Sequence, residues 1–502
     1  MMEEVNMKRT IGILFIAVFV LFVHSPSYAQ AQTSEIEEEI LYSIIIDRYN
    51  NLNHDRDKQV QLDDPNAYHG GDLEGITAKL DSFEELGYTT LVLSPLMNNA
   101  SGGYHGYWIE DFYSVEEQFG NMEDLHTLIE EAHKRDIKVI MEFVTNYVAE
   151  SHPIIEDSDK TDWVDEDNQI NTAWGEKAVR LNQRNAAVQQ YLIDVANYWM
   201  SETDIDGFKL HAADQSSQEF ITNLTRAIKA KNEDFYLLAD VLHQHADTTS
   251  LQENNHIDAV DNYSLQEKMA KVFSKAGTPV SDLNQSLGTG NASQMIFIDD
   301  KTTERFTQAL AENGRNALTT WKLALTYMYT LPGVPEIYQG TELPMYGTGL
   351  EEVQQLVQFN SGNPDLTEFH NRISSLRIQF PVLTHGDYQM VASKGAMTVF
   401  KRSYEGESMY IAINNDEESQ SVSISDLPSG VELRGYLGDN TVREDEDGIY
   451  KLGLARETAE VYTVEEDNGL NWLFIGFVVG IFILFIIGVI VLSAKQKHRK
   501  TK

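Results

Sequence analysis

The sequence predicts an α/β fold: a closed (β/α)8 barrel with a small insert after its third strand, then an antiparallel β-sandwich domain and one C-terminal transmembrane helix. Between about residues 40 and 345, short apolar runs alternate with amphipathic helical patterns, as in βα units around a parallel sheet. Beyond about residue 375, apolar and polar residues alternate in period two between turn residues, which indicates antiparallel strands. Residues 472–493 are nearly uncharged and long enough to cross a bilayer.

Eight strand candidates lie in the first region, and eight parallel strands close a TIM barrel. They are ILYSIIIDRY (40–49), TTLVLSPLM (89–97), KVIMEFV (138–144), DGFKLHA (206–212), FYLLADVL (235–242), DAVDNYS (258–264), QMIFIDD (294–300) and VPEIYQG (334–340). Helical patterns lie between them, for example at 73–87 and 122–136. We assign residues 36–375 to the barrel, whose functional groups are expected on the loops after the strand carboxyl ends.

The sequence predicts two further units, an insert within the barrel and a domain after it. Residues 147–188 are too many for an ordinary βα loop and are rich in Asp, Asn and Trp, so they predict an insert over the barrel mouth. Residues 376–466 predict the separate β domain. Its strand candidates are VASKGAMTVFKRS, ESMYIAINND, SQSVSIS and ETAEVYTVEE.

Both ends of the chain have the pattern of targeting segments. Residues 1–29 combine Lys8 and Arg9 with the apolar run IGILFIAVFVLFV and the small residues of Ser27-Tyr28-Ala29, which predicts a cleaved signal peptide, with an uncleaved anchor as the alternative. Residues 471–493 predict a transmembrane helix, and the basic tail at 494–502 places the C-terminus in the cytoplasm. The prediction is a single-pass cell-membrane protein with its large domain outside the cell. The lack of cysteine favours a bacterial exterior.

The overall charge narrows the range of partners. The formal net charge is −40, which argues against a nucleic-acid partner because phosphates would be repelled. A neutral ligand such as a sugar, or a cation, is compatible with this charge.

Long stretches of the chain resemble the α-amylase family, glycoside hydrolase family 13. They are DRYNNLN (47–53), YHGGDLEGITAKLDSFEELGYTTLVLSPL (68–96), GGYHGYWIEDFYSVEEQFG (102–120), YLIDVANYWMSETDIDGF (191–208) and PGVPEIYQGTE (332–342). The resemblance implies a barrel with an insert after the third strand and a C-terminal β-sandwich. It also implies retaining chemistry at α-glucosidic bonds, for which two carboxyl groups must lie roughly 5–5.5 Å apart.

The residues at the family's catalytic positions depart from its pattern. Where the family has Gly-Phe-Arg-x-Asp, this chain reads GFKLH (207–211), so His211 holds the nucleophile position. Asp240 holds the position of the glutamate acid/base, and Thr302 that of the second aspartate, in FIDDKTTERF (297–306). We expect that hydrolysis is lost and that Lys209 and His211 pair with Asp240, Asp300 or Glu142.

The resemblance also marks substrate-binding positions. His105, Tyr107 and Trp108 match the aromatic stretch that packs against a glucose ring, and Tyr107 can stack on a sugar face. Lys209, Tyr147 and Lys301 replace the arginine and the histidines that support the substrate. The alternative is that the three aromatic residues are only core residues at the barrel rim.

Metal and cofactor expectations are negative. Asn146 matches one ligand of the family's calcium site, but Arg180 stands where the family has an aspartate ligand, and Gln215 would supply a carbonyl. The guanidinium would replace the ion, so no cofactor is predicted. A metal site at the barrel mouth, built from His211 and from the segment 240–245 with Asp240, His243 and His245, is a further alternative.

The predicted function is therefore that of a cell-surface α-amylase homologue, catalytically impaired, that binds α-glucan or oligosaccharide, or serves as a scaffold for a membrane-protein partner. The alternative is an active, atypical α-glucan hydrolase or glucanotransferase that uses Asp240. An open cleft at Tyr107 and Trp108 would indicate sugar binding. A closed mouth with a large apolar surface patch would indicate a scaffold.

Overall fold

The computed structural model describes residues 36–165, 173–242, 246–254, 256–287, 293–467 and 472–499, and the single residues 167, 170 and 469. The predicted signal peptide at 1–29 lies outside the described residues. So do His243 and His245, and with them the alternative metal site that they would form with His211.

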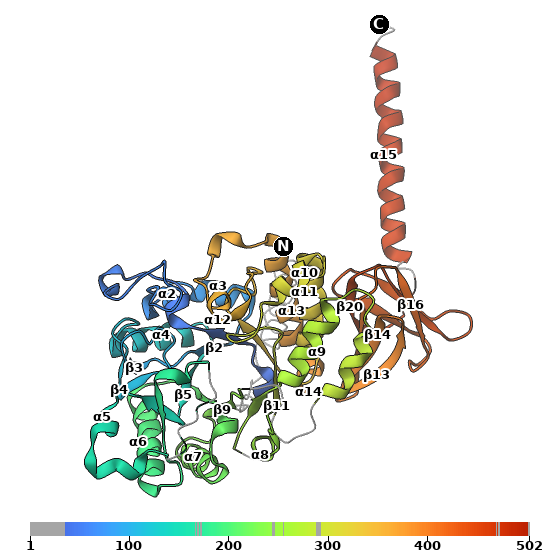
Figure 1. Cartoon of the computed structure of the whole chain (residues 1–502). Helices are drawn as coiled ribbons and strands as arrows, with labels where there is room; N and C mark the ends of the chain where they lie inside the picture. The colour runs from blue at the N-terminus through green and yellow to red at the C-terminus, as the bar shows by residue number, and fades with distance from the viewer. Residues whose placement is uncertain are drawn as a thin grey trace, which may run out of the picture. The chain divides into compact units, whose positions relative to one another are not determined.

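The barrel is closed by eight parallel strands, one from each predicted run, in the order β1-β12-β11-β10-β9-β8-β5-β2 (Figure 1). The strands are β1 (Leu41–Ile44), β2 (Thr90–Leu93), β5 (Lys138–Val144), β8 (Gly207–His211), β9 (Tyr236–Ala239), β10 (Ala259–Asp261), β11 (Ser293–Ile296) and β12 (Val334–Tyr338). The prediction of a (β/α)8 barrel is confirmed.

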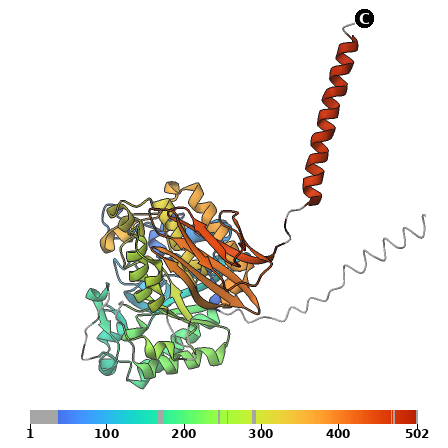
Figure 2. The same ribbon diagram turned by 90° about the vertical axis from the view of Figure 1, so that its right-hand side faces the viewer.

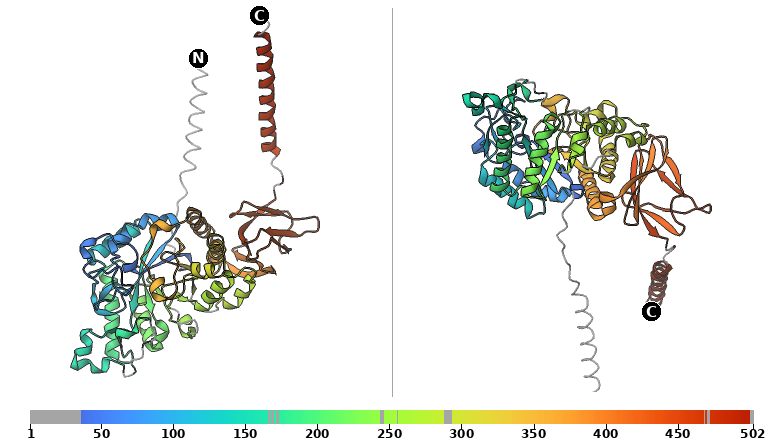
Figure 3. Two further views of the ribbon diagram at one scale, coloured as in Figure 1. Left: turned by 45° about the horizontal axis from the view of Figure 1, so that its top comes forward. Right: turned by 90° about the horizontal axis from the view of Figure 1, so that it is seen from below.

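Helices follow most of the strands and lie around the outside of the barrel (Figure 3). They are α2 (Leu73–Thr77), α3 (Leu80–Leu86), α4 (Met122–His133), α6 (Ala186–Glu202), α7 (Gln218–Lys231), α8 (Thr249–Gln252), α9 (Tyr263–Phe273), α10 (Phe306–Glu312), α11 (Ala317–Thr330), α12 (Gly349–Val353), α13 (Pro364–Gln379) and α14 (Pro381–His385). The helix predicted at 73–87 is two helices, while α4 begins as predicted because Asn121 and Asp124 form a capping box.

The side chains inside the barrel are apolar at one end of its axis and charged at the other. Away from the mouth the interior is filled by an apolar cluster of Ile36, Leu41, Val92, Ile140, Tyr236, Leu238, Ala259, Met295 and Val334. Strand β8 shows how the period-two alternation divides the side chains. Phe208 and Leu210 join the main core, whereas Lys209 and His211 face the charged groups at the mouth.

Two hairpins and several short helices lie beside the mouth. The loop after β2 carries the paired strands β3 (Met97–Asn99) and β4 (Ile109–Val115). The predicted insert carries β6 (Tyr147–Ala149), α5 (Pro153–Glu156), and the 3-10 helices η4 (Ser158–Trp163) and η5 (Gly175–Lys177), and it ends in β7 (Ala178–Arg180), which pairs with β6.

The C-terminal domain is antiparallel, as predicted (Figure 2). One sheet has the order β13-β14-β15-β20-β17-β18, and β16 pairs with β19. Their bounds are β13 (Asp387–Lys394), β14 (Met397–Tyr404), β15 (Glu407–Asn414), β16 (Gln420–Ile424), β17 (Val431–Gly435), β18 (Thr441–Arg443), β19 (Tyr450–Leu454) and β20 (Thr458–Glu466). Val422 and Leu452 of the smaller sheet share one core with Val399 and Tyr410 of the larger.

The apolar segment near the C-terminus forms helix α15 (Trp472–Arg499). Among the residues that the structure describes, none of the helices is both long and apolar enough to span a membrane. This finding overturns the predicted single-pass location in the cell membrane with a span at 471–493.

Candidate active site

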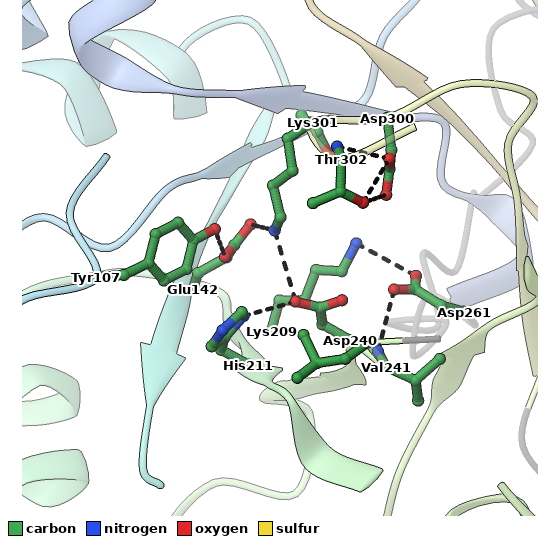
Figure 4. Close-up of polar contacts among 12 residues, drawn as sticks. Tyr107, Glu142, Lys209, His211, Asp240, Val241, Asp261, Asp300, Lys301 and Thr302 are labelled. Carbon is green, nitrogen blue, oxygen red and sulfur yellow. Dashed lines mark hydrogen bonds and ion pairs between the residues drawn. The ribbon is translucent and has the colours of Figure 1, made fainter. Parts of the chain in front are cut away.

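Charged and titratable side chains from six barrel strands meet at the mouth of the barrel, and Figure 4 labels all of them except Glu336. They are Glu142 of β5, Lys209 and His211 of β8, Asp240 after β9, Asp261 of β10, Lys301 after β11 and Glu336 of β12. Six of them are buried, and the side chain of Lys301 is 12% exposed. Burial of so many charges requires that they pair with one another.

Two lysines organise this cluster. The Lys301 ammonium lies 2.5 Å from Oε1 of Glu142 and 3.5 Å from Oδ2 of Asp240. The Lys209 ammonium lies 2.8 Å from Glu336 and 3.3 Å from Asp261. Burial alone would lower the pKa of each lysine, but the facing carboxylates outweigh it and raise the pKa of both above the usual value. Both side chains are therefore fixed positive charges.

His211 and Asp240 form a third pair. Nδ1 of His211 lies 2.7 Å from Oδ2 of Asp240. Burial would raise the pKa of the Asp240 carboxyl, but the Lys301 charge and the hydrogen bond with His211 hold that pKa well below its usual value. The predicted pairing of His211 with Asp240 is confirmed, whereas Lys209 pairs with two carboxylates that the sequence analysis did not consider.

Thr302 does not join this cluster. Its side chain is exposed, and its hydroxyl donates to Oδ1 of Asp300 at 3.0 Å. Asp300 also accepts a hydrogen bond from the hydroxyl of Tyr263. The three predicted catalytic positions therefore hold an imidazole, a salt-bridged aspartate and an exposed threonine.

The aromatic residues at the mouth are covered. Tyr107 is 0% exposed and Trp108 is 6% exposed. Gly106 between them and His105 has φ +88° and lies so close to Pro95 that a Cβ atom would be 2.0 Å from the Pro95 carbonyl oxygen, so this turn requires glycine. The Tyr107 hydroxyl donates to Glu142.

The ring of Tyr107 lies against two other rings. It is stacked on Trp174 with centroids 4.1 Å apart, and its centroid is 4.5 Å from that of His211. Tyr147 meets His211 edge-on at 6.0 Å, and His105 accepts a hydrogen bond from the Tyr107 amide. The stretch from 105 to 108 is thus part of a closed aromatic cluster in this structure.

The remaining cavity at the mouth is small. Among the described residues it has a volume of about 20 Å³ and is lined by Lys209, Asp240, Asp261, Lys301, Glu336 and their neighbours. That volume accommodates about one water molecule. A glucosyl ring does not fit there without a rearrangement.

The residues at the family's calcium position do not fit calcium. Oδ1 of Asn146 accepts hydrogen bonds from Gln183 and from Ser216. Nη2 of Arg180 donates to the Gln215 carbonyl at 2.9 Å. Calcium requires free oxygen ligands, but these two oxygens already accept hydrogen bonds, one of them from a cation.

Glu142, His211 and Asp240 form a second arrangement with metal-ligand chemistry, since their ligand atoms lie within 4.8 Å of one another. Lys301 contacts both carboxylates of this group. The ammonium therefore supplies the positive charge that a metal ion would bring.

Three residues of the site were missed by the sequence analysis. Asp261 and Glu336 lie in two predicted strands, DAVDNYS and VPEIYQG, so a carboxylate inside an otherwise apolar run was the available signal. Trp174 lies in the insert, where no periodic pattern indicates which side chain turns inward.

Comparison with known proteins places this geometry in context. Residues 43–174 and 172–375 match the family model "Alpha amylase, catalytic domain", and residues 386–462 match "Alpha-amylase C-terminal domain". An intracellular maltogenic amylase of Bacillus subtilis is 27% identical over 439 residues, covering 81% of this chain and 73% of that protein. A cyclomaltodextrinase of Thermoanaerobacter pseudethanolicus is 26% identical over 423 residues, covering 77% and 72%.

Solved structures match over similar lengths. The α-amylase of Anoxybacillus has a TM-score of 0.81 and 37% identity, covering 87% of this chain and 100% of that one. An α-amylase from Geobacillus thermoleovorans, in complex with acarbose, has a TM-score of 0.79 and 37% identity over the same shares of both chains.

Proposed function

This chain belongs to the α-amylase family of glycoside hydrolases, and we propose that it is a member that recognises α-glucans without hydrolysing them. The observation that carries this proposal is the pairing at the mouth. Lys301 lies against Glu142 and Asp240, and His211 takes the place of the nucleophile.

Retaining hydrolysis requires a carboxylate that attacks and a carboxylic acid that donates a proton. His211 offers no carboxylate. Asp240 is an anion because Lys301 and His211 hold its pKa well below the usual value, and an ionised carboxyl has no proton to donate to a leaving group. Both roles are therefore unfilled at the positions where the family has them.

Sugar recognition is supported by what the site retains. Tyr107 and Trp108 remain at the mouth beside a set of hydrogen-bonding groups, the combination that fixes a neutral ligand. The Geobacillus relative is described in complex with acarbose. A scaffold is favoured by the closed mouth. However, within the described ranges outside α15, the exposed large apolar side chains are scattered and form no single patch: Leu52, Leu62, Tyr113, Tyr346 and Ile378.

The rival is an atypical hydrolase that uses Asp240. One observation favours it, since Asp240 bonds Nδ1 of His211 and so orients the ring, as a carboxylate orients a histidine base in other hydrolases. In that case His211 would act as a general base, and its Nε2 would take a proton from the water molecule that attacks the sugar.

The test is turnover by the full chain and by Asp240→Asn, with amylose, maltooligosaccharides, sucrose and trehalose. New reducing ends and transfer products are followed at high protein concentration. We expect no product from either protein. Product that forms with the wild type and with Asp426→Asn, a matched change in the β domain, but not with Asp240→Asn would establish the rival.

A further inference from the structure

The insert places one aromatic ring flat against the predicted sugar platform. Trp174, which directly precedes η5, stacks on Tyr107 with an interplanar angle of 9°. Its side chain is buried, with only 4% of the residue exposed. A parallel stack of this kind covers one whole face of the Tyr107 ring, because aromatic rings in contact exclude water between them.

The backbone of Trp174 is held in place by the same aromatic stretch. Nε1 of Trp108 donates to the Trp174 carbonyl at 2.7 Å, and the ring of His105 lies 5.3 Å from the indole. Lys177, three residues on, lies over the Trp108 ring at 4.4 Å. The contact therefore joins two loops, the one after β2 and the insert.

The ring of Tyr107 adjoins the polar groups of the mouth. Lys301 lies 5.5 Å from the Tyr107 ring centroid, Glu142 accepts from its hydroxyl, and His211 lies beside it. A flat ligand with hydroxyl groups, set on Tyr107 in place of the indole, would find donors and acceptors within reach. A pyranose ring has this shape and chemistry, with an apolar face and polar edges.

We propose that Trp174 is an internal occupant of an α-glucan subsite on Tyr107, and that a glucosyl unit binds there only when the indole leaves. This inference rests on the proposed recognition of α-glucans. Binding in the wild type is weakened because only the fraction of molecules with the indole displaced is competent. The insert thereby sets the affinity of the mouth.

The experiment compares the wild type with Trp174→Ala by calorimetric titration with maltotriose. Removal of the indole frees the face of Tyr107, so maltotriose should bind at least about tenfold more tightly than to the wild type. The double variant Trp174→Ala/Tyr107→Ala should lose this gain. Trp163→Ala, which truncates another tryptophan of the insert, is the matched control and should bind as the wild type does. Cellotriose, with β-linkages, tests the linkage preference.

A folded Trp174→Ala whose affinity equals that of the wild type would overturn the inference and leave Trp174 as a core residue. If that variant does not fold, as judged by circular dichroism, oxidation of wild-type Trp174 by N-bromosuccinimide takes its place. Maltoheptaose at saturation should increase oxidation at Trp174, read by peptide mass spectrometry, and unchanged oxidation would count against the inference. Trp199, buried in α6, is the internal reference.

The two proposals fail in different ways. Products in the titrated sample of Trp174→Ala would overturn the non-hydrolytic function and leave the role of Trp174 intact. Equal and measurable binding of maltotriose by the wild type and by Trp174→Ala, without products, would overturn only the role of Trp174. No binding by either protein would overturn the proposed recognition as well.

Discussion

The two ends of the barrel interior are filled by opposite kinds of side chain, apolar at one end and charged at the other. Away from the mouth, Leu41, Val92 and Leu238 fill the space with apolar side chains. At the mouth, the barrel encloses lysines and carboxylates in contact with one another. Apolar side chains close the barrel without any need for partners, whereas each charge at the mouth is tolerated only because of the others. The mouth is therefore the end at which single substitutions do the most damage.

The largest effect is expected for Lys301→Met. The change removes the cation that faces Glu142 and Asp240 and leaves their charges buried, which costs about 3–5 kcal/mol of unfolding free energy. Denaturant melts at pH 7 measure it. Lys134→Met, at the C-terminal end of α4, is the control, since Lys134 is about half exposed and pairs with Glu130 and Glu131 at the surface. This variant should lose much less stability than Lys301→Met, because surface ion pairs contribute little.

A double variant tests whether Lys301 and Glu142 are energetically coupled. Lys301→Met combined with Glu142→Gln removes a charge from each side of the pair, so part of the lost stability should return. Recovery of at least about 1 kcal/mol would mark a coupled pair. Purely additive losses would mean that the two side chains act independently.

The apolar end should respond less strongly and in a different manner. Leu238→Ala removes buried methyl groups and leaves a cavity, at a cost of about 3 kcal/mol. The loss should be the same at low and high salt and at pH 6 and pH 8, because no charge is involved. Denaturant melts under those four conditions check this, and a salt-dependent loss would contradict the division between the two ends.

Glu342 shows what happens to a buried carboxyl that has no ion pair among the described residues. Its Oε1 accepts from the Tyr42 hydroxyl, and burial raises its pKa to about 7. The folded state therefore binds this proton more tightly than the unfolded state, whose glutamate pKa is about 4.3. This contribution to stability is complete below about pH 4.3 and is lost as the pH rises to about 7.

Glu342→Gln should remove that part of the pH dependence. Relative to the wild type, the variant should gain on the order of 2 kcal/mol between pH 5 and pH 8, measured by melts at half-unit steps. Glu84→Gln, on the exposed face of α3, should keep the wild-type profile. Parallel profiles for wild type and Glu342→Gln would contradict the assignment. Asp240 provides the contrast, because its nearby cations lower its pKa instead.

The sequence was sufficient for the barrel but not for the network inside it. Eight apolar runs located the strands, and period-two alternation placed Lys209 and His211 on the inner face. The partners of Lys209 could not be predicted from the sequence, because Glu336 is 127 positions away and only the closed barrel brings β12 opposite β8. The stacking of Trp174 on Tyr107 could not be predicted either, since it depends on how an insert of short, irregular elements folds.

Arg180 is a second built-in cation, at the edge of the insert, and it lies at the predicted calcium position. Its guanidinium bonds the Gln215 carbonyl, so Arg180→Met should cost about 1.5 kcal/mol. Thermal melts with EDTA and with added calcium should coincide for the wild type, because the oxygens of Asn146 and Gln215 are already engaged. Gln61→Met, another polar residue on the barrel domain, is the control for the substitution. A calcium-dependent rise in the wild-type melting temperature would mean that the ion displaces the Arg180 guanidinium.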